Sequence, residues 1–154
     1  RHGRSCIDNH YNGEGVPVRM EDIFVARVMS TSLHTVSPNA LVEDAAQKML
    51  DNGIGSVIVV DEENHLEGIL TTTDFVEIVA EQKPKDQTPV SKYMTTDVVT
   101  TTAQESIRDV ADVMVEHGFH HAPVVDEDEG VIGMITTSDL AGYLSRVQSP
   151  SPEE

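Results

Sequence analysis

The chain has 154 residues, enough for one compact domain, and it carries 27 acidic side chains against 10 Lys and Arg, a formal charge of −17. A surface this negative repels phosphate backbones and anionic lipids, so we expect no binding to nucleic acid or to membranes. No apolar run approaches the ~20 residues of a membrane-spanning helix, and the N-terminal stretch lacks a secretory-type apolar segment. These features favour a cytoplasmic protein whose single Cys6 forms no internal disulfide.

The acidic excess has two explanations. It can serve solubility alone. It is also what we expect of a halophilic protein in an acidic proteome, because a salty cytoplasm screens the self-repulsion that would otherwise loosen the chain. The second explanation predicts that salt stabilises the fold.

Residues 1–19 have no apolar periodicity and predict a flexible N-terminal arm, either native or a remnant added to the chain. A helix is predicted from Met20, with one face formed by Ile23, Phe24, Arg27 and Val28. We expect it to belong to a first repeat over 20–82, followed by a linker over 83–89 and a second repeat over 90–148. The tail, 149–154, has a composition typical of disorder.

Residues 29–75 and 94–140 are two copies of one pattern at an offset of 65, with 15 identities in 47 aligned positions. Each copy switches period in the order strand, helix, strand, strand, helix. The strands are predicted at 34–36, 56–60 and 66–70 in copy one, and at 99–101, 122–125 and 131–135 in copy two. The sequence therefore predicts an α+β fold of two β-α-β-β-α repeats, packed with pseudo-twofold symmetry, with helices covering small sheets.

The first helix of each copy has an apolar stripe at i, i+3, i+4, i+7 and i+8. We expect these side chains to be buried: Val42, Ala45, Ala46, Met49 and Leu50, then Ile107, Val110, Ala111, Met114 and Val115. On the last helices we expect burial of Phe75, Ile78, Val79, Leu140, Tyr143, Leu144 and Val147. Gly53 and Gly118 fit C-caps, Ser106 with Asp109 fits a capping box, and Leu41 cannot cap the first helix.

Each copy ends on a Thr-x-x-Asp junction between an apolar strand and a helix, at Thr71 to Asp74 and at Thr136 to Asp139. One interpretation is a capping box that satisfies free backbone N–H groups. The other is a ligand site, because a helix N-terminus attracts phosphate and a carboxylate can accept the hydroxyls of a ribose. Gly68 and Gly133, just before, would allow close approach of a ligand or of neighbouring backbone.

These residues resemble a known family. The segments VMSTSLHTVSP, EDAAQKMLDNG and VIVVDEENHLEGILTTTD, with YMTTDVVTTT, VADVMVEHG and APVVDEDEGVIGMITTSD, are similar to a tandem pair of CBS (cystathionine-beta-synthase) domains, a Bateman-type regulatory module. The resemblance implies a sensor that binds an adenosine-containing ligand in the cleft between two repeats and that commonly dimerises.

The resemblance also implies the ligand-binding residues. In copy one they are Thr35, Val36, Ile54, Ser56, Val57, Thr71 and Asp74. In copy two they are Thr100, Thr101, Phe119, His121, Ala122, Pro123, Thr136 and Asp139. Apolar side chains would enclose the adenine while backbone groups read its edge.

The sequence departs from the family pattern in two respects. Before the aspartate, where many relatives carry a basic residue, it has Thr72-Thr73 and Thr137-Ser138, which disfavours polyphosphates. Other cations that could meet a phosphate are Arg27, Lys92 and Arg108, or a bound metal ion. The copies also differ around the site, with Gly55-Ser56 and Ile58 opposite His120-His121 and Pro123, so we expect unequal pockets.

The prediction is a stand-alone, non-enzymatic regulatory module that senses AMP, ADP, ATP, S-adenosylmethionine or a related compound, requires no cofactor or metal, forms a homodimer and signals to an effector protein. A ligand-free CBS interaction scaffold is the first alternative. A metal-dependent hydrolase is the second, because His117, His120 and His121 lie within five residues. Their positions at a helix end and a strand start instead favour a helix-dipole partner and pocket lining.

Overall fold

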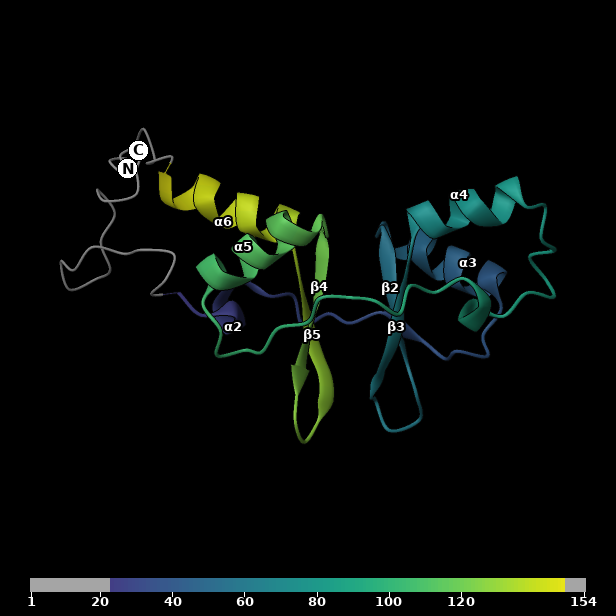
Figure 1. Cartoon of the computed structure of the whole chain (residues 1–154), viewed down its shortest axis with the longest axis horizontal. Coiled ribbons are helices and arrows are strands. Elements are labelled where there is room, and N and C mark those ends of the chain that lie inside the picture. Colours follow the sequence, from purple (N-terminus) through teal and green to yellow (C-terminus); the bar gives the residue numbers. More distant parts are fainter. Residues whose placement is uncertain (1–22, 149–154) are drawn as a thin grey trace. The chain divides into compact units, whose positions relative to one another are not determined.

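The computed structural model describes residues 23–148, with the side chains of residues 147 and 148 excepted (Figure 1). The arm and tail predicted at 1–19 and 149–154, and the side chain of Val147, lie outside the described residues. The chain divides into two compact units. Unit 2 contains residues 32–98 and 125–132, and unit 1 contains the described residues 23–31, 99–124 and 133–148. Over the described residues, no helix is long and apolar enough to cross a membrane.

Unit 2 is built on a three-stranded sheet in the order β1-β2-β3, from β1 (Thr35–Val36), β2 (Ser56–Val60) and β3 (Leu66–Thr71). Strand β1 runs parallel to β2, and β2 runs antiparallel to β3 with Ser56 opposite Thr71. Helix α3 (Val42–Asn52) connects β1 to β2, and helix α4 (Thr72–Ala80) follows β3 without a gap. A short 3-10 helix, η2 (Val90–Lys92), follows α4 in the same unit.

The core of unit 2 lies between this sheet and the helices. Its buried members are Val42, Ala45, Met49, Val57, Val59, Leu70, Ile78 and Val90. Two predictions were wrong, since Leu50 is 76% exposed and Val79 is 75% exposed. The apolar face of each helix is wider than the part that contacts the sheet, so the apolar residues at the edge of that face remain exposed to solvent.

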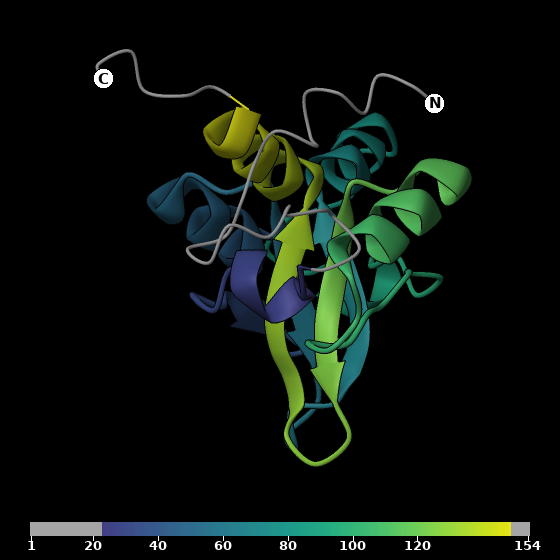
Figure 2. The same cartoon turned by 90° about the vertical axis from the view of Figure 1, so that its left-hand side faces the viewer.

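Unit 1 contains α2 (Val25–Val28), α5 (Ile107–His117) and α6 (Thr137–Gln148), grouped around the paired strands β4 (His121–Asp126) and β5 (Gly130–Thr136) (Figure 2). The hairpin end of these two strands, residues 125–132, belongs to unit 2. The predicted strand at 99–101 reduces to a single parallel bridge between Thr101 and Val124. Ile107, Val110, Met114, Leu140 and Tyr143 are buried as predicted. Val115, at 82% exposed, is not, and Phe24 on the N-terminal side of α2 is 56% exposed.

The predicted helix ends are confirmed. Gly53 and Gly118 adopt left-handed conformations, with φ of 61° and 74°, directly after α3 and α5. The Ser106 hydroxyl accepts the Asp109 N–H at 3.0 Å, which is one half of the predicted capping box, and within residues 23–148 the return bond to the Asp109 carboxylate is absent. Leu41 provides no side-chain cap for α3, as predicted. Glycine is favoured at both C-caps because any Cβ is strained at positive φ.

The segment that leads into each repeat packs with the other repeat. Helix α2 precedes copy one in sequence, yet the Val25 N–H donates to the Glu105 carbonyl at 2.7 Å and the Ile107 N–H donates to the Ile23 carbonyl at 2.9 Å, both in unit 1. Conversely, η2 precedes copy two, yet the Val90 N–H donates to the Ala40 carbonyl at 2.7 Å in unit 2. Each unit is therefore assembled from segments distant in sequence.

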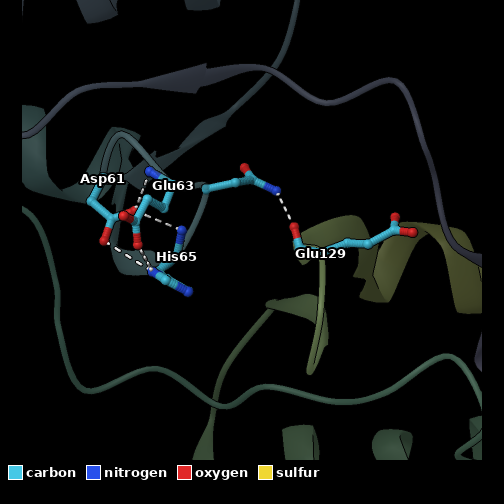
Figure 3. A network of polar contacts seen from close by, with 5 residues as sticks. Asp61, Glu63, His65 and Glu129 are labelled. Atoms are coloured by element: carbon cyan, nitrogen blue, oxygen red, sulfur yellow. Dashed lines mark hydrogen bonds and ion pairs between the residues drawn. The ribbon is translucent and has the colours of Figure 1, made fainter.

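The loop between β2 and β3 contacts the loop between β4 and β5 within unit 2 (Figure 3). The Asn64 side-chain amide donates to the carbonyls of Glu129 at 2.7 Å and Val131 at 2.8 Å, and the Val131 N–H donates to the Asn64 carbonyl at 3.1 Å. Asn64 has φ of 70° and Gly130 has φ of 79°. The Asp61 carboxylate accepts the N–H of His65, which lowers the pKa of Asp61.

Candidate functional site

The Thr-x-x-Asp junction of copy one is a capping box at the start of α4. The Thr71 N–H donates to the Asp74 carboxylate at 2.9 Å. In return, the Thr71 side chain accepts the backbone N–H of Asp74, which completes the box. Asp74 is buried, with 8% of its surface exposed. The capping interpretation is thus confirmed for copy one, and the carboxylate is held in one orientation.

A residue that the sequence did not single out, Thr95, binds the second oxygen of Asp74. The start of copy two lies along the edge of β3, where Thr95 and Ile69 exchange backbone hydrogen bonds of 2.8 and 2.9 Å. The Thr95 hydroxyl donates to Asp74 Oδ1 at 3.3 Å, while Thr71 occupies Oδ2. A Cβ on Gly68 would lie 2.7 Å from the Thr95 carbonyl oxygen. The glycine therefore accommodates neighbouring backbone, and it was the sequence signal for this contact.

The junction of copy two has the same box. The Thr136 N–H donates to Asp139 Oδ2 at 2.9 Å, and the Asp139 N–H donates to the Thr136 hydroxyl at 3.0 Å. Ser30, the equivalent of Thr95, pairs with Met134 through backbone bonds of 2.8 and 3.0 Å. A Cβ on Gly133 would lie 2.8 Å from the Met29 sulfur. Asp139 itself is half-buried, unlike Asp74.

In each unit the segment after the first helix lies beside the junction. The Thr72 N–H donates to the Gly55 carbonyl at 3.3 Å, and the Thr137 N–H donates to the His120 carbonyl at 3.0 Å. These bonds bring the predicted residues Ser56 and His121 next to the starts of α4 and α6. The two copies differ at this position, with Ser56 in copy one and His121 in copy two.

The first-strand residues lie further along the sheet. Thr35 is opposite Ile58 and Val36 is opposite Val59 in the parallel pairing. Both residues line a cavity of about 600 Å³ whose other lining residues are Ser37, Pro38, Asn39, Val60, Asp61, Glu62 and Glu63. Neither Thr71 nor Asp74 lines it. The Lys48 amine donates to the Thr35 carbonyl at 2.7 Å and ties this strand to α3.

Several predicted ligand-binding residues are part of the core. Val57 and Ala122 have no exposed surface, and Pro123 is buried. Thr101 is 3% exposed, and its hydroxyl donates to the Glu105 carboxylate. The half-buried or exposed members of the predicted set are Thr35, Val36, Ile54, Ser56, Thr71, Thr100, Phe119, His121, Thr136 and Asp139. Side chains of this second group are the ones that a small molecule can reach.

The electrostatics of copy two are set by histidine. Burial lowers the pKa of His121 below its ordinary 6.5, the charge of His120 lowers it further, and Asp139 acts in the opposite direction. The net shift favours the neutral form of the His121 imidazole, and the Asp139 carboxylate partly opposes it. His117 is placed differently, with Nδ1 3.0 Å from the Val113 carbonyl in the last turn of α5. Among the described residues, no three His, Cys, Asp or Glu side chains gather as a metal site.

The three cations that we predicted to meet phosphate lie on α2, η2 and α5. Arg27 and Lys92 are exposed on α2 and η2, and Arg108 Nε lies 3.8 Å from Asp112 on α5. The positions before the aspartates, from Thr72 to Thr73 and from Thr137 to Ser138, are exposed and uncharged.

The comparisons with known proteins match both copies. The CBS domain family model matches residues 25–81 and 90–146. The chain belongs to the CBS domain family. The predicted resemblance and the α+β class of two repeats are therefore confirmed.

This CBS chain is similar both to a protein of comparable length and to part of a longer one. It is 34% identical to the CBS domain-containing protein YhcV of Bacillus subtilis, over 76% of this chain and 82% of that protein. It is 28% identical to a homoserine O-acetyltransferase of Methanococcus vannielii, over 94% of this chain but 29% of that protein. The crystal structure of the CBS domain pair of protein MJ0100, in complex with 5′-methylthioadenosine and S-adenosyl-L-methionine, has a TM-score of 0.73 at 27% identity and covers 80% of this chain and 96% of that one.

Proposed function

We propose that this CBS pair is a regulatory module that binds an adenosine-containing ligand and passes the binding event to a partner protein. The observation that carries the proposal is the duplicated Thr-x-x-Asp box at the start of α4 and of α6, with a strand start held against it in each unit. The similarity to a CBS pair solved with two adenosine compounds supports the same reading. The box presents N–H groups, hydroxyls and a carboxylate, which together suit a ribose and its substituent.

Within the adenosine class, the charges favour nucleosides, a monophosphate or a sulfonium compound over polyphosphates. A di- or triphosphate needs cations close to its oxygens, and the residues before Asp74 and Asp139 are uncharged threonine and serine. The chain as a whole carries −17, which further repels a highly anionic ligand. S-adenosylmethionine and 5′-methylthioadenosine should bind more tightly than ATP.

The ligand would act by favouring one of two arrangements of the protein, which a partner then distinguishes. The module needs no chemistry of its own for this role, so we propose that it is not an enzyme. If the sites take no ligand, the chain is instead an interaction scaffold. The capped state of Asp74, whose two oxygens are both engaged by protein groups, is the observation that favours this alternative.

We also propose that the module is a homodimer. The exposed apolar side chains recur at equivalent positions of the two copies, Leu50 on α3 and Val115 on α5. In unit 2, Leu50 and Val79 help to line a groove of about 560 Å³. A second copy of the same chain would bury such patches, because a symmetric dimer covers the same surface on both subunits. Leu50→Glu with Val115→Glu should reduce the mass measured by light scattering, and an unchanged mass would reject these faces.

Titration calorimetry with S-adenosylmethionine, 5′-methylthioadenosine, AMP and ATP tests the binding function. The double variant Asp74→Ala with Asp139→Ala should lose binding. Because both changes also remove helix caps, Ser106→Ala is the matched control, since it removes a cap remote from both boxes at a similar cost of ~1 kcal/mol. Full affinity in the double variant would reject the site, and no binding of any compound to the native chain would favour the scaffold.

A further inference from the structure

The two aspartates differ in how far the protein already engages them. Both oxygens of Asp74 accept hydrogen bonds, Oδ2 from Thr71 and Oδ1 from the Thr95 hydroxyl at 3.3 Å. Asp139 accepts the Thr136 N–H on Oδ2, and within residues 23–148 no hydrogen bond to its Oδ1 is present. Asp74 is also more deeply buried than Asp139. A ligand hydroxyl would therefore compete with a protein donor at Asp74 Oδ1, whereas it would meet no such competitor at Asp139 Oδ1.

The difference originates in the second residue of each copy. Thr95 and Ser30 occupy equivalent positions, and each pairs by backbone with the strand that carries its box, Thr95 with β3 and Ser30 with β5. Only Thr95, of these two described residues, donates its hydroxyl to the aspartate. Threonine has a branched Cβ that restricts its hydroxyl to few orientations, whereas the serine hydroxyl is free to turn to water.

The neighbouring strand start adds a second difference. In copy two the imidazole of His121 lies within the electrostatic influence of Asp139, and in copy one the equivalent residue is Ser56. A neutral imidazole offers one donor and one acceptor nitrogen to a ligand. Its flat ring also supplies apolar contact to a base, which serine does not.

We infer that the two sites are unequal, with the adenosine compound bound first and more tightly in copy two at Asp139 and His121, while Thr95 holds the carboxylate of copy one closed. This inference rests on the proposed function and assigns the order in which its sites fill. Thr95 is a positioning residue in this arrangement, since it acts through Asp74.

Calorimetry with S-adenosylmethionine on the full chain measures affinity and stoichiometry together. The native chain should bind a single tight ligand. Asp139→Ala should weaken that event about tenfold or more, the effect of losing a hydrogen bond to a charged group, and Asp74→Ala should change it less than about threefold. Because both variants lose one box of the same kind, each is the stability control for the other.

Two changes at the equivalent positions Thr95 and Ser30 separate closure of the carboxylate from loss of folding. Thr95→Val keeps the branched shape but removes the hydroxyl, and it should add a second binding event in copy one. Ser30→Thr gives copy two the side chain that engages Asp74 in copy one, and it should weaken the first event. Two equal sites in the native chain, or an equal loss from Asp74→Ala and Asp139→Ala, would overturn the inference while leaving the binding function intact. Absence of binding to the native chain would overturn both.

Discussion

Gly130→Ala should be one of the most damaging single-methyl additions in unit 2. Gly130 has φ of 79°, a conformation that costs an alanine about 1–2 kcal/mol. The new Cβ would also lie 2.1 Å from the Asn64 carbonyl oxygen, a separation that forces the two loops apart. Opening them loses the three hydrogen bonds between Asn64 and residues 129–131, at about 1 kcal/mol each. The expected total is about 4 kcal/mol.

Urea unfolding of the native chain, Gly130→Ala and Gly118→Ala measures these contributions separately. Gly118 has φ of 74° and nothing within 4 Å of an added Cβ, so its variant reports the conformational cost alone. The free energy of unfolding should therefore fall by about 1–2 kcal/mol in Gly118→Ala and by about 3 kcal/mol more in Gly130→Ala. Equal losses in the two variants would mean that the loop contact adds no stability, and the reasoning would fail.

Three further predictions follow from charge and capping. The lowered pKa of His121 means that the unfolded chain takes up the histidine proton more readily than the folded one, so stability should fall as the pH drops through the ordinary value of 6.5. His121→Asn should flatten thermal stability between about pH 5 and 8, and an unchanged slope would assign the titration elsewhere. The charge of −17 should make the melting temperature rise from about 0.1 to 2 M KCl; no rise would leave solubility as its explanation. Ser106→Ala should cost ~1 kcal/mol by urea unfolding, and a neutral result would show that the 3.0 Å bond to Asp109 is unimportant.

Local chemistry made much of the fold predictable. The helix ends at Gly53 and Gly118 and the boxes at Thr71 and Thr136 depend on residues a few positions apart, so the sequence contains all the information that determines them. The same is true of the repeat, because each copy repeats the periods of its strands and helices. Burial was less predictable, as Leu50 and Val115 show, because the width of a contact depends on the partner surface and not on the helix.

The packing partners of α2 and η2 could not be assigned from sequence. Nothing in the residues around Val25 or Val90 says which repeat they will pack with, since that depends on which backbone groups the rest of the fold leaves unpaired. Gly68 and Gly133 did indicate close backbone approach, but a glycine does not name its neighbour. The contact between Thr95 and Asp74 follows from that pairing, so a residue that closes one site was invisible until the pairing was known.

The placement of α2 also sets an order of events during synthesis. Ile23 and Val25 are synthesised before residues 32–98, yet their backbone partners are Ile107 and Glu105, which emerge only after all of the continuous segment of unit 2. Residues 32–98 can thus begin to fold while the side chains of Ile23 and Val25 are still exposed to solvent. Helix α2 is therefore made before the continuous segment of unit 2 but finds its backbone partners after that segment, which reverses the usual vectorial order of folding.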